Sequence, residues 1–168
     1  MYNNFLCTIN RIINSKYNST DILLQLKLLL NLYKSEEIKE MINTEINKKF
    51  DINKLNVIRN DQFGYYKYNL IKTHNFDIYD IKWEKDSFSK IHDHPDKGCI
   101  MYMYNNGNLT ETNFINYEKK QHSLNNLYSC NIAYKIGDKY LHKIYANKFT
   151  ETLHIYIPGN HKTTYYTL

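Results

Sequence analysis

The chain has 168 residues, of which 42% are hydrophobic and 23% are charged. This composition excludes a disordered chain and suits one folded domain with a sizeable core. The net charge is +5, but the basic residues are scattered among acidic ones, so the sequence argues against a nucleic-acid partner.

The three cysteines, Cys7, Cys99 and Cys130, are too widely spaced for the framework of a small disulfide-bonded domain. The start of the chain lacks the pattern of a signal peptide, and its most apolar stretch, residues 22–33, is too short to cross a membrane. We therefore expect a cytoplasmic protein that is a monomer and has no membrane partner. Cys7 and Cys130 are expected to be small buried hydrophobic residues.

Residues 1–48 are predicted to be helical. Ser19, Thr20 and Asp21 are candidate N-cap residues before a segment, 22–33, whose apolar residues recur at helical spacing. A second short helix is predicted from Ser35 onward. The leucine-rich face of the first helix is expected to cover a sheet rather than to bind a partner.

From Phe63 onward, apolar and polar residues alternate as in strands. The β-like segments are 66–70, 78–83, 99–104, 109–116, 127–134, 141–145, 153–157 and 163–166, with turn signals between several of them. Many short strands after a helical start predict a mainly β fold over residues 63–168, a β-barrel or jelly roll with the helices packed outside. We expect the whole chain, 1–168, to be a single domain.

Two histidines, His92 and His94, are separated by one residue. On a strand their side chains point to the same face and can bind one metal ion. A third histidine, His142, lies in the later segment 141–145, and facing strands of a barrel can bring all three together. The other histidines His74, His122 and His161 are expected to be solvated.

The ligand types narrow the choice of metal. A structural zinc site would usually need four protein ligands, often cysteines, and the chain has no C-x-x-C pair. Residues 95–99, after the histidine pair, contain no glutamate that could act as a fourth ligand. Three neutral imidazoles leave the charge of the ion intact and positions open for an anionic ligand such as a thiolate, and then for oxygen. This donor set favours an iron-dependent oxygenase that acts on a thiol.

Four ordered segments of the chain resemble the cysteine dioxygenase family of cupins. Trp83 followed by Ser89-Lys90-Ile91-His92-Asp93-His94 resembles the family's Trp…Ser-Ile-His-Asp-His. The segments 107–112, 141–144 and 153–156 resemble its Gly-Asn-Leu-Lys-Glu-Thr, Leu-His-Arg-Val and Leu-His-Leu-Tyr. The resemblance covers residues 66–156, and the helical start also fits the family.

The resemblance implies a cupin-type barrel in which His92, His94 and His142 bind ferrous iron, Fe(2+). It also implies that Cys99 and Tyr156 occupy the positions of the family's thioether-forming pair. His154 matches the histidine that hydrogen-bonds this tyrosine, and Thr152 takes the place of its serine partner. The implied catalytic residues are therefore Tyr156, Cys99 and His154. The implied reaction is the oxidation of a small thiol to its sulfinate with both atoms of O2.

One departure concerns substrate recognition. The family's Tyr-x-Arg-Asn motif, whose arginine holds the substrate carboxylate, reads here Tyr66-Lys67-Tyr68-Asn69. We expect Tyr66 and Tyr68 at the substrate, with Lys67 on the opposite face of the strand unless a bulge turns it inward. A phenol lacks the charge and the two-pronged geometry of a guanidinium.

Several substrates and one non-catalytic role remain open. L-Cysteine is the leading substrate, and 3-mercaptopropionate, cysteamine or the N-terminal cysteine of a peptide are alternatives. The alternative to an enzyme is a cupin that binds a metal without catalysing a reaction. The chain ends soon after Tyr156, so most of the family's C-terminal segment is missing and we expect a more open pocket.

Overall fold

The computed structural model describes residues 5–49, 57–60, 63–104, 107–115, 120–128, 132–135 and 140–167. Within these ranges three helices precede the strands: α1 (Phe5–Ile13), α2 (Ser19–Asn31) and α3 (Ser35–Lys49). The strands are β1 (Val57–Asn60), β2 (Tyr65–Lys72), β3 (Asp77–Trp83), β4 (Ile91–His92), β5 (Gly98–Met103), β6 (Asn108–Ile115), β7 (Lys120–Tyr128), β8 (Ile132–Lys135), β9 (Tyr140–Ala146), β10 (Thr150–Ile157) and β11 (Tyr165–Tyr166).

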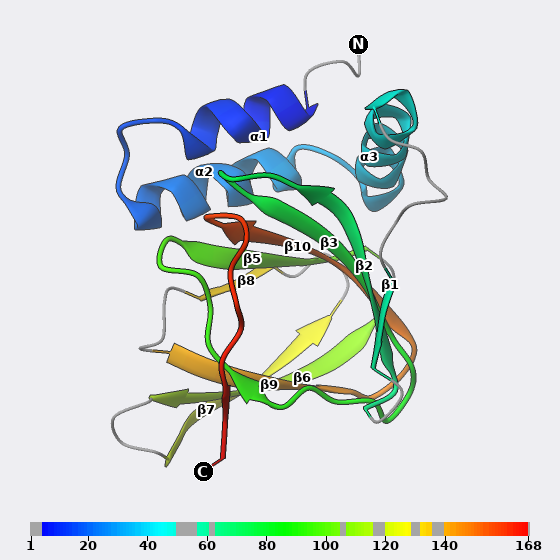
Figure 1. Ribbon diagram of the computed structural model, residues 1–168. Coiled ribbons are helices and arrows are strands. Elements are labelled where there is room, and N and C mark those ends of the chain that lie inside the picture. The colour runs from blue at the N-terminus through cyan, green and yellow to red at the C-terminus, as the bar shows by residue number, and fades with distance from the viewer. Residues whose placement is uncertain are drawn as a thin grey trace.

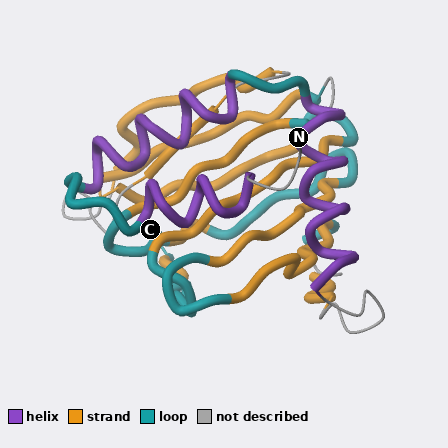
Figure 2. The backbone as a smooth tube through the Cα atoms, turned by 90° about the horizontal axis from the view of Figure 1, so that it is seen from above, coloured by secondary structure: helices purple, strands orange, loops and turns teal. Residues whose placement is uncertain are grey.

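The strands form two antiparallel sheets that face each other (Figure 1). One sheet has the order β1-β2-β3-β10-β5-β8 and the other has the order β11-β4-β9-β6-β7. The helices lie across the outer face of the first sheet, as the view from above makes clear (Figure 2). The predicted mainly β barrel with helices packed outside is thus confirmed.

The helices cover the first sheet with apolar side chains. Ile22, Leu23, Leu26 and Leu30 of α2 are buried in one cluster with residues of the sheet. The prediction that this leucine-rich face covers a sheet is confirmed. The helix cap differs from the prediction, because the side chain of Asn18 accepts the hydrogen bond from the Asp21 amide.

The cysteines lie in different environments. Cys7 is exposed on α1, so the prediction of a buried Cys7 is wrong. Cys99 is buried in β5. Cys130 lies outside the described residues. No helix in the described part of the chain is long and apolar enough to span a membrane.

Alternation along β5 and β10 separates two cores. Ile100 and Tyr102 of β5 and Ile155 of β10 join the helix-covered cluster. Cys99 and Tyr156, from the same two strands, belong to the cluster between the sheets. Neighbouring residues of a strand point to opposite faces of the sheet. The side chains of each strand therefore lie alternately in the outer core and in the interior of the barrel.

Strand register brings distant residues of the sequence side by side. The antiparallel pair β4–β9 sets His92 opposite His142, and the pair β5–β10 sets Cys99 opposite Tyr156. β7 begins at Lys120, although the sequence pattern predicted a strand only from Leu127. Residues 129–131, inside the predicted strand 127–134, lie outside the described residues.

Candidate metal centre

Three imidazole rings converge inside the barrel on the sheet that contains β4 and β9. His92 is in β4, His94 follows it directly, and His142 is in β9. The Nε2 atom of His142 lies 3.1 Å from Nε2 of His92 and 3.1 Å from Nε2 of His94. One ligand atom from each residue lies within 4.8 Å of the others, so the three side chains predicted from the sequence form a group that could hold a metal ion.

The donor set fits a metal with open coordination positions. Two nitrogens bound at right angles, each about 2.1 Å from one ion, lie about 3.0 Å apart. The observed separations of 3.1 Å match this arrangement. His94 and His142 are buried, and burial together with the neighbouring His142 lowers the pKa of His92 to about 3. The His92 ring is therefore neutral, as a metal ligand must be.

Hydrogen bonds behind the rings fix which nitrogen faces the centre. Nδ1 of His142 donates to Oε1 of Glu111 at 2.7 Å, and Nδ1 of His92 donates to the carbonyl oxygen of Lys90 at 2.8 Å. In each ring the Nε2 lone pair then points to the centre. Glu111 is buried in β6, and Nδ2 of Asn113 donates to its second oxygen at 3.3 Å.

The sequence analysis missed the role of Glu111. Leu109, on the same face of β6, is buried between the sheets. An acidic residue at such an inward position was the available signal, because a buried carboxylate needs a hydrogen-bond partner.

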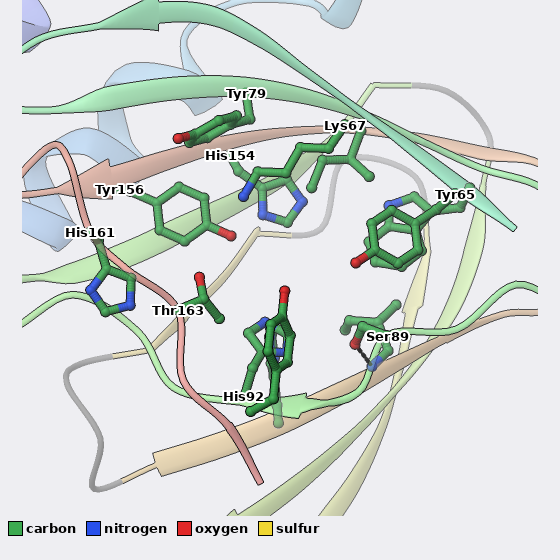
Figure 3. Close-up of a pocket in the computed structure, with 14 residues that line it drawn as sticks. Tyr65, Lys67, Tyr79, Ser89, His92, His154, Tyr156, His161 and Thr163 are labelled. Atoms are coloured by element: carbon green, nitrogen blue, oxygen red, sulfur yellow. Dashed lines mark hydrogen bonds between the residues drawn. The ribbon is translucent and has the colours of Figure 1, made fainter. Parts of the chain in front are cut away.

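A cavity of about 290 Å³ opens next to the histidines, and Figure 3 displays its lining. His92 and His142 form part of the wall on one sheet, and Lys67, Tyr79, His154 and Tyr156 form part of the wall on the other. The remaining lining residues are Tyr65, Ile81, Trp83, Ser89, Ile144, His161, Thr163 and Tyr165. The metal ligands and the facing side chains thus come from opposite sheets.

The wall opposite the histidines contains a hydrogen-bonded and stacked series of side chains. Trp83 donates through Nε1 to Oγ1 of Thr152 at 2.9 Å, and this hydroxyl is hydrogen-bonded to Nε2 of His154 at 2.9 Å. The ring of His154 stacks on Tyr156, with centroids 6.0 Å apart and an interplanar angle of 16°. Burial raises the pKa of Tyr156 well above its usual value, so the phenol keeps its proton and can donate a hydrogen bond.

Cys99 and Tyr156 lie opposite each other on adjacent antiparallel strands. Both are buried in the cluster between the sheets. Side chains at such positions have Cβ atoms roughly 4.5–5.5 Å apart, which is close enough for a thiol to reach an aromatic ring. The predicted cross-link between them stays a prediction.

Lys67, and not Tyr66 or Tyr68, lines the cavity. Tyr65 lines it too, so β2 alternates regularly here, and its register shift lies further on, between Asn69 and Ile71. The expectation that Lys67 points to the opposite face is therefore wrong, and no bulge is needed to turn it inward. The strand presents residues 65 and 67 to the cavity in place of residues 66 and 68.

The Lys67 ammonium is enclosed by aromatic rings. Its Nζ lies 3.9 Å from the ring centroid of Tyr79 and 4.8 Å from that of Tyr156. Burial lowers the pKa of Lys67 to about 8, against the opposing influence of Cys99 and Asp77. Lys67 is therefore predominantly charged at neutral pH, and it lines the cavity.

The C-terminal residues also reach the cavity. His161, Thr163 and Tyr165 line it, so His161, which we expected to be solvated, faces the candidate site. The expectation of a pocket more open than that of the family stays a prediction. His74 is exposed, as expected, and the side chain of His122 lies outside the described residues.

Comparison with models of known protein families shows which family the chain belongs to. The family model of cysteine dioxygenase type I matches residues 13–167. The chain belongs to this family. A search of curated proteins finds no match to the sequence. The family match and the three-histidine group together agree with the resemblance found in the sequence segments around these residues.

Solved structures support the fold. An oxalate decarboxylase variant from Bacillus subtilis is similar with a TM-score of 0.57 at 14% identity, over 70% of this chain and 32% of that chain. The oxalate decarboxylase of Lactobacillus farciminis, in a formate complex, has a TM-score of 0.56 at 13% identity, over 69% and 35%. An RmlC-like cupin from Shewanella frigidimarina has a TM-score of 0.50 at 10% identity, over 66% and 89%.

These likenesses establish the cupin fold. The matched region covers only about a third of the oxalate decarboxylase chains, and the identities are low.

The hydrogen bond from His142 to Glu111 generates a prediction about metal affinity. We expect Glu111→Gln to weaken metal binding by about 10- to 100-fold, because the amide holds the imidazole less strongly and its NH2 group can face the ring N–H. Competition with a chelator of known affinity measures this change. Glu84→Gln, at an exposed glutamate, is the matched control and should bind metal like the wild type. Equal affinity in both variants would contradict the assigned role of Glu111.

Proposed function

We propose that the protein is an iron-dependent thiol dioxygenase that converts a small thiol into its sulfinate, R–SH + O2 → R–SO2⁻ + H⁺. The observation that carries this proposal is the three-histidine group facing Tyr156 and His154 across one cavity. A simple metal-binding module would have no need of a buried phenol whose neighbours are fixed by hydrogen bonds and stacking. Membership of the cysteine dioxygenase type I family supports the same reaction.

The three histidines would hold ferrous iron. Bound there, Fe(2+) would supply open positions for the thiolate and the electrons that activation of dioxygen requires. The residues of the chain then orient the substrate. The protonated Tyr156 phenol is available as a hydrogen-bond donor toward the reacting atoms, and His154 and Thr152 hold it in place.

Lys67 would anchor a carboxylate of the substrate. It lies on the cavity wall, whereas Tyr68, which takes the place of the family's arginine in the sequence motif, does not line the cavity. Among the described residues, no aspartate or glutamate lines the cavity, so an ammonium group would find no carboxylate partner there. These charges favour thiols that carry a carboxylate, with L-cysteine as the first candidate and 3-mercaptopropionate as the second. They disfavour cysteamine.

Oxygen consumption tests the proposed reaction. Iron-loaded protein should consume one O2 per thiol oxidised, and labelled O2 should place both labelled atoms in the sulfinate. We expect turnover with L-cysteine or 3-mercaptopropionate, and loss of both iron and turnover in His142→Ala. Absence of oxygen uptake with every thiol tested, in a fully iron-loaded protein, would instead support the non-catalytic metal-binding cupin.

Substitution of Lys67 tests the carboxylate anchor. Lys67→Met should raise KM for carboxylate-bearing thiols by about 10- to 100-fold and leave cysteamine kinetics nearly unchanged, because only the former lose a charge-assisted hydrogen bond. Tyr68→Phe, on the neighbouring residue outside the cavity, serves as the control and should behave like the wild type. A similar rise in KM for cysteamine would argue against a carboxylate partner.

The pH dependence of binding follows from the lowered pKa of Lys67. The anchor is charged below its pKa of about 8, so KM for a carboxylate thiol should be low near pH 7 and should rise as the pH passes 8. Lys67→Arg should remove this rise, because arginine stays charged throughout. The ratio of KM values for the two proteins, measured from pH 6.5 to 9.5 as a rough working range, isolates the lysine from other titrating groups.

We also propose that Cys99 and Tyr156 become joined by a thioether bond during turnover. Loss of the thiol hydrogen and one ring hydrogen, with their two electrons and two protons passing to O2 to give hydrogen peroxide, would form the bond. After many turnovers, peptide mapping should yield a linked pair lacking two hydrogens, and Cys99→Ser should yield none. Separate, unmodified peptides from active wild-type protein would refute this proposal.

A further inference from the structure

Residues 161–166, which we call the C-terminal wall, run across the cavity beside the metal-binding strand (Figure 3). His161, Thr163 and Tyr165 line the cavity, although Tyr165 is also 55% exposed, and Lys162 and Thr164 between them do not line it. This alternation is that of an extended segment with one face on the cavity. The wall is therefore part of the site, although it follows the last core strand of the barrel.

The beginning of the wall is fastened by a buried aspartate. The amide of Asn160 donates to Oδ2 of Asp77 at 2.8 Å, and its side-chain amide donates to the carbonyl oxygen of Thr73 at 3.3 Å. Gly159 lies so close to this turn that an added Cβ would be 1.9 Å from the Thr73 oxygen. The chain is thus held against the β2–β3 turn just before it enters the wall.

The far end is fastened by Asp93, between the two histidines of the H-x-H pair. Its Oδ1 accepts from the amide of Thr164 at 2.8 Å and lies 3.2 Å from Nε2 of His161. The amide of Asp93 donates to the carbonyl oxygen of Thr164 at 3.2 Å. β11 then pairs with β4, with Tyr165 opposite His92. The strand β4, which contains His92, is therefore also the strand that pairs with the end of the wall.

We propose that Asp93 is a positioning residue that holds residues 161–166 as the outer wall of the cavity, and that this wall restricts the site to small free thiols. The proposal rests on the proposed function and deepens it by naming the residues that exclude larger thiols. The cavity of about 290 Å³ lies at the lower end of the range of small-molecule sites, roughly 300–1,000 Å³. An N-terminal cysteine of a peptide would need space for the following residues where the wall lies.

Thiol binding to cobalt-loaded protein without oxygen tests the wall independently of catalysis. Thiolate coordination to Co(2+) gives an absorption band that can be titrated. We expect wild-type protein to bind L-cysteine or 3-mercaptopropionate, and to bind a cysteine-initiated pentapeptide at least about tenfold more weakly because the wall excludes it.

Two variants weaken the wall in different ways. His161→Ala removes a lining side chain, and Thr164→Pro removes the N–H that donates to Asp93. Each should raise the ratio of the peptide affinity to the small-thiol affinity by about tenfold. Lys162→Ala, at an exposed residue of the same segment, is the matched control and should match the wild type in both titrations.

Three outcomes would overturn the proposal: wild-type protein that binds the peptide as tightly as the small thiol, unchanged peptide affinity in His161→Ala with normal metal content, or wild-type protein that binds no thiol. Discrimination between thiols without oxygen consumption by the iron-loaded protein would refute the proposed reaction and leave the wall intact. Oxygen consumption without discrimination between the peptide and the small thiol would refute the role of the wall and leave the proposed reaction intact.

Discussion

The constraint on which the site depends is the convergence of three neutral imidazole nitrogens at one buried place. Positively charged rings at 3.1 Å would repel each other and could not bind a cation, so each ring must give its lone pair to the centre. Burial removes the charge from His92, and the Glu111 carboxylate fixes the tautomer of His142. Because His92, His142 and Glu111 are on three neighbouring strands, β4, β9 and β6, the centre is a structural unit of the second sheet rather than a set of independent ligands.

The first sheet packs against the helices with one face and lines the cavity with the other. Strand alternation provides this division: Ile155 of β10 faces the helices, and His154 and Tyr156 on either side of it face the cavity. Packing of the helices on the outer face buries Ile78, Ile100 and Ile155 there, while Asp80, Lys82 and Glu151 of the same face lie beside Lys39 of α3. The rigid outer core then supports the hydrogen bonds from Trp83 to Thr152 and from Thr152 to His154, which position the phenol.

The cavity between these sheets has an asymmetric set of charges. Lys67 brings a cation whose desolvation is partly compensated by the faces of Tyr79 and Tyr156. The carboxylates near the site are engaged elsewhere: Glu111 lies behind a metal ligand, Asp77 holds Asn160, and Asp93 holds Thr164. Acidic groups thus maintain the architecture while the cation is left facing the substrate. This division of roles supports the proposed preference for an anion-bearing thiol.

The sequence by itself determined the helical start, the mainly β remainder and the three histidines, because these follow from local periodicity and from ligand chemistry. The pairing of Thr152 with His154, two residues apart on one strand, was implied only by the resemblance to the family. The register of β2 could not be decided in this way: tyrosines at 65, 66 and 68 make either face plausible, and only pairing with β3 turned Lys67 inward. Glu111 was missed because its partner, His142, is on another strand. The C-terminal wall was also decided by tertiary structure, since Asp93 and Thr164 are 71 residues apart and local sequence patterns do not encode such contacts.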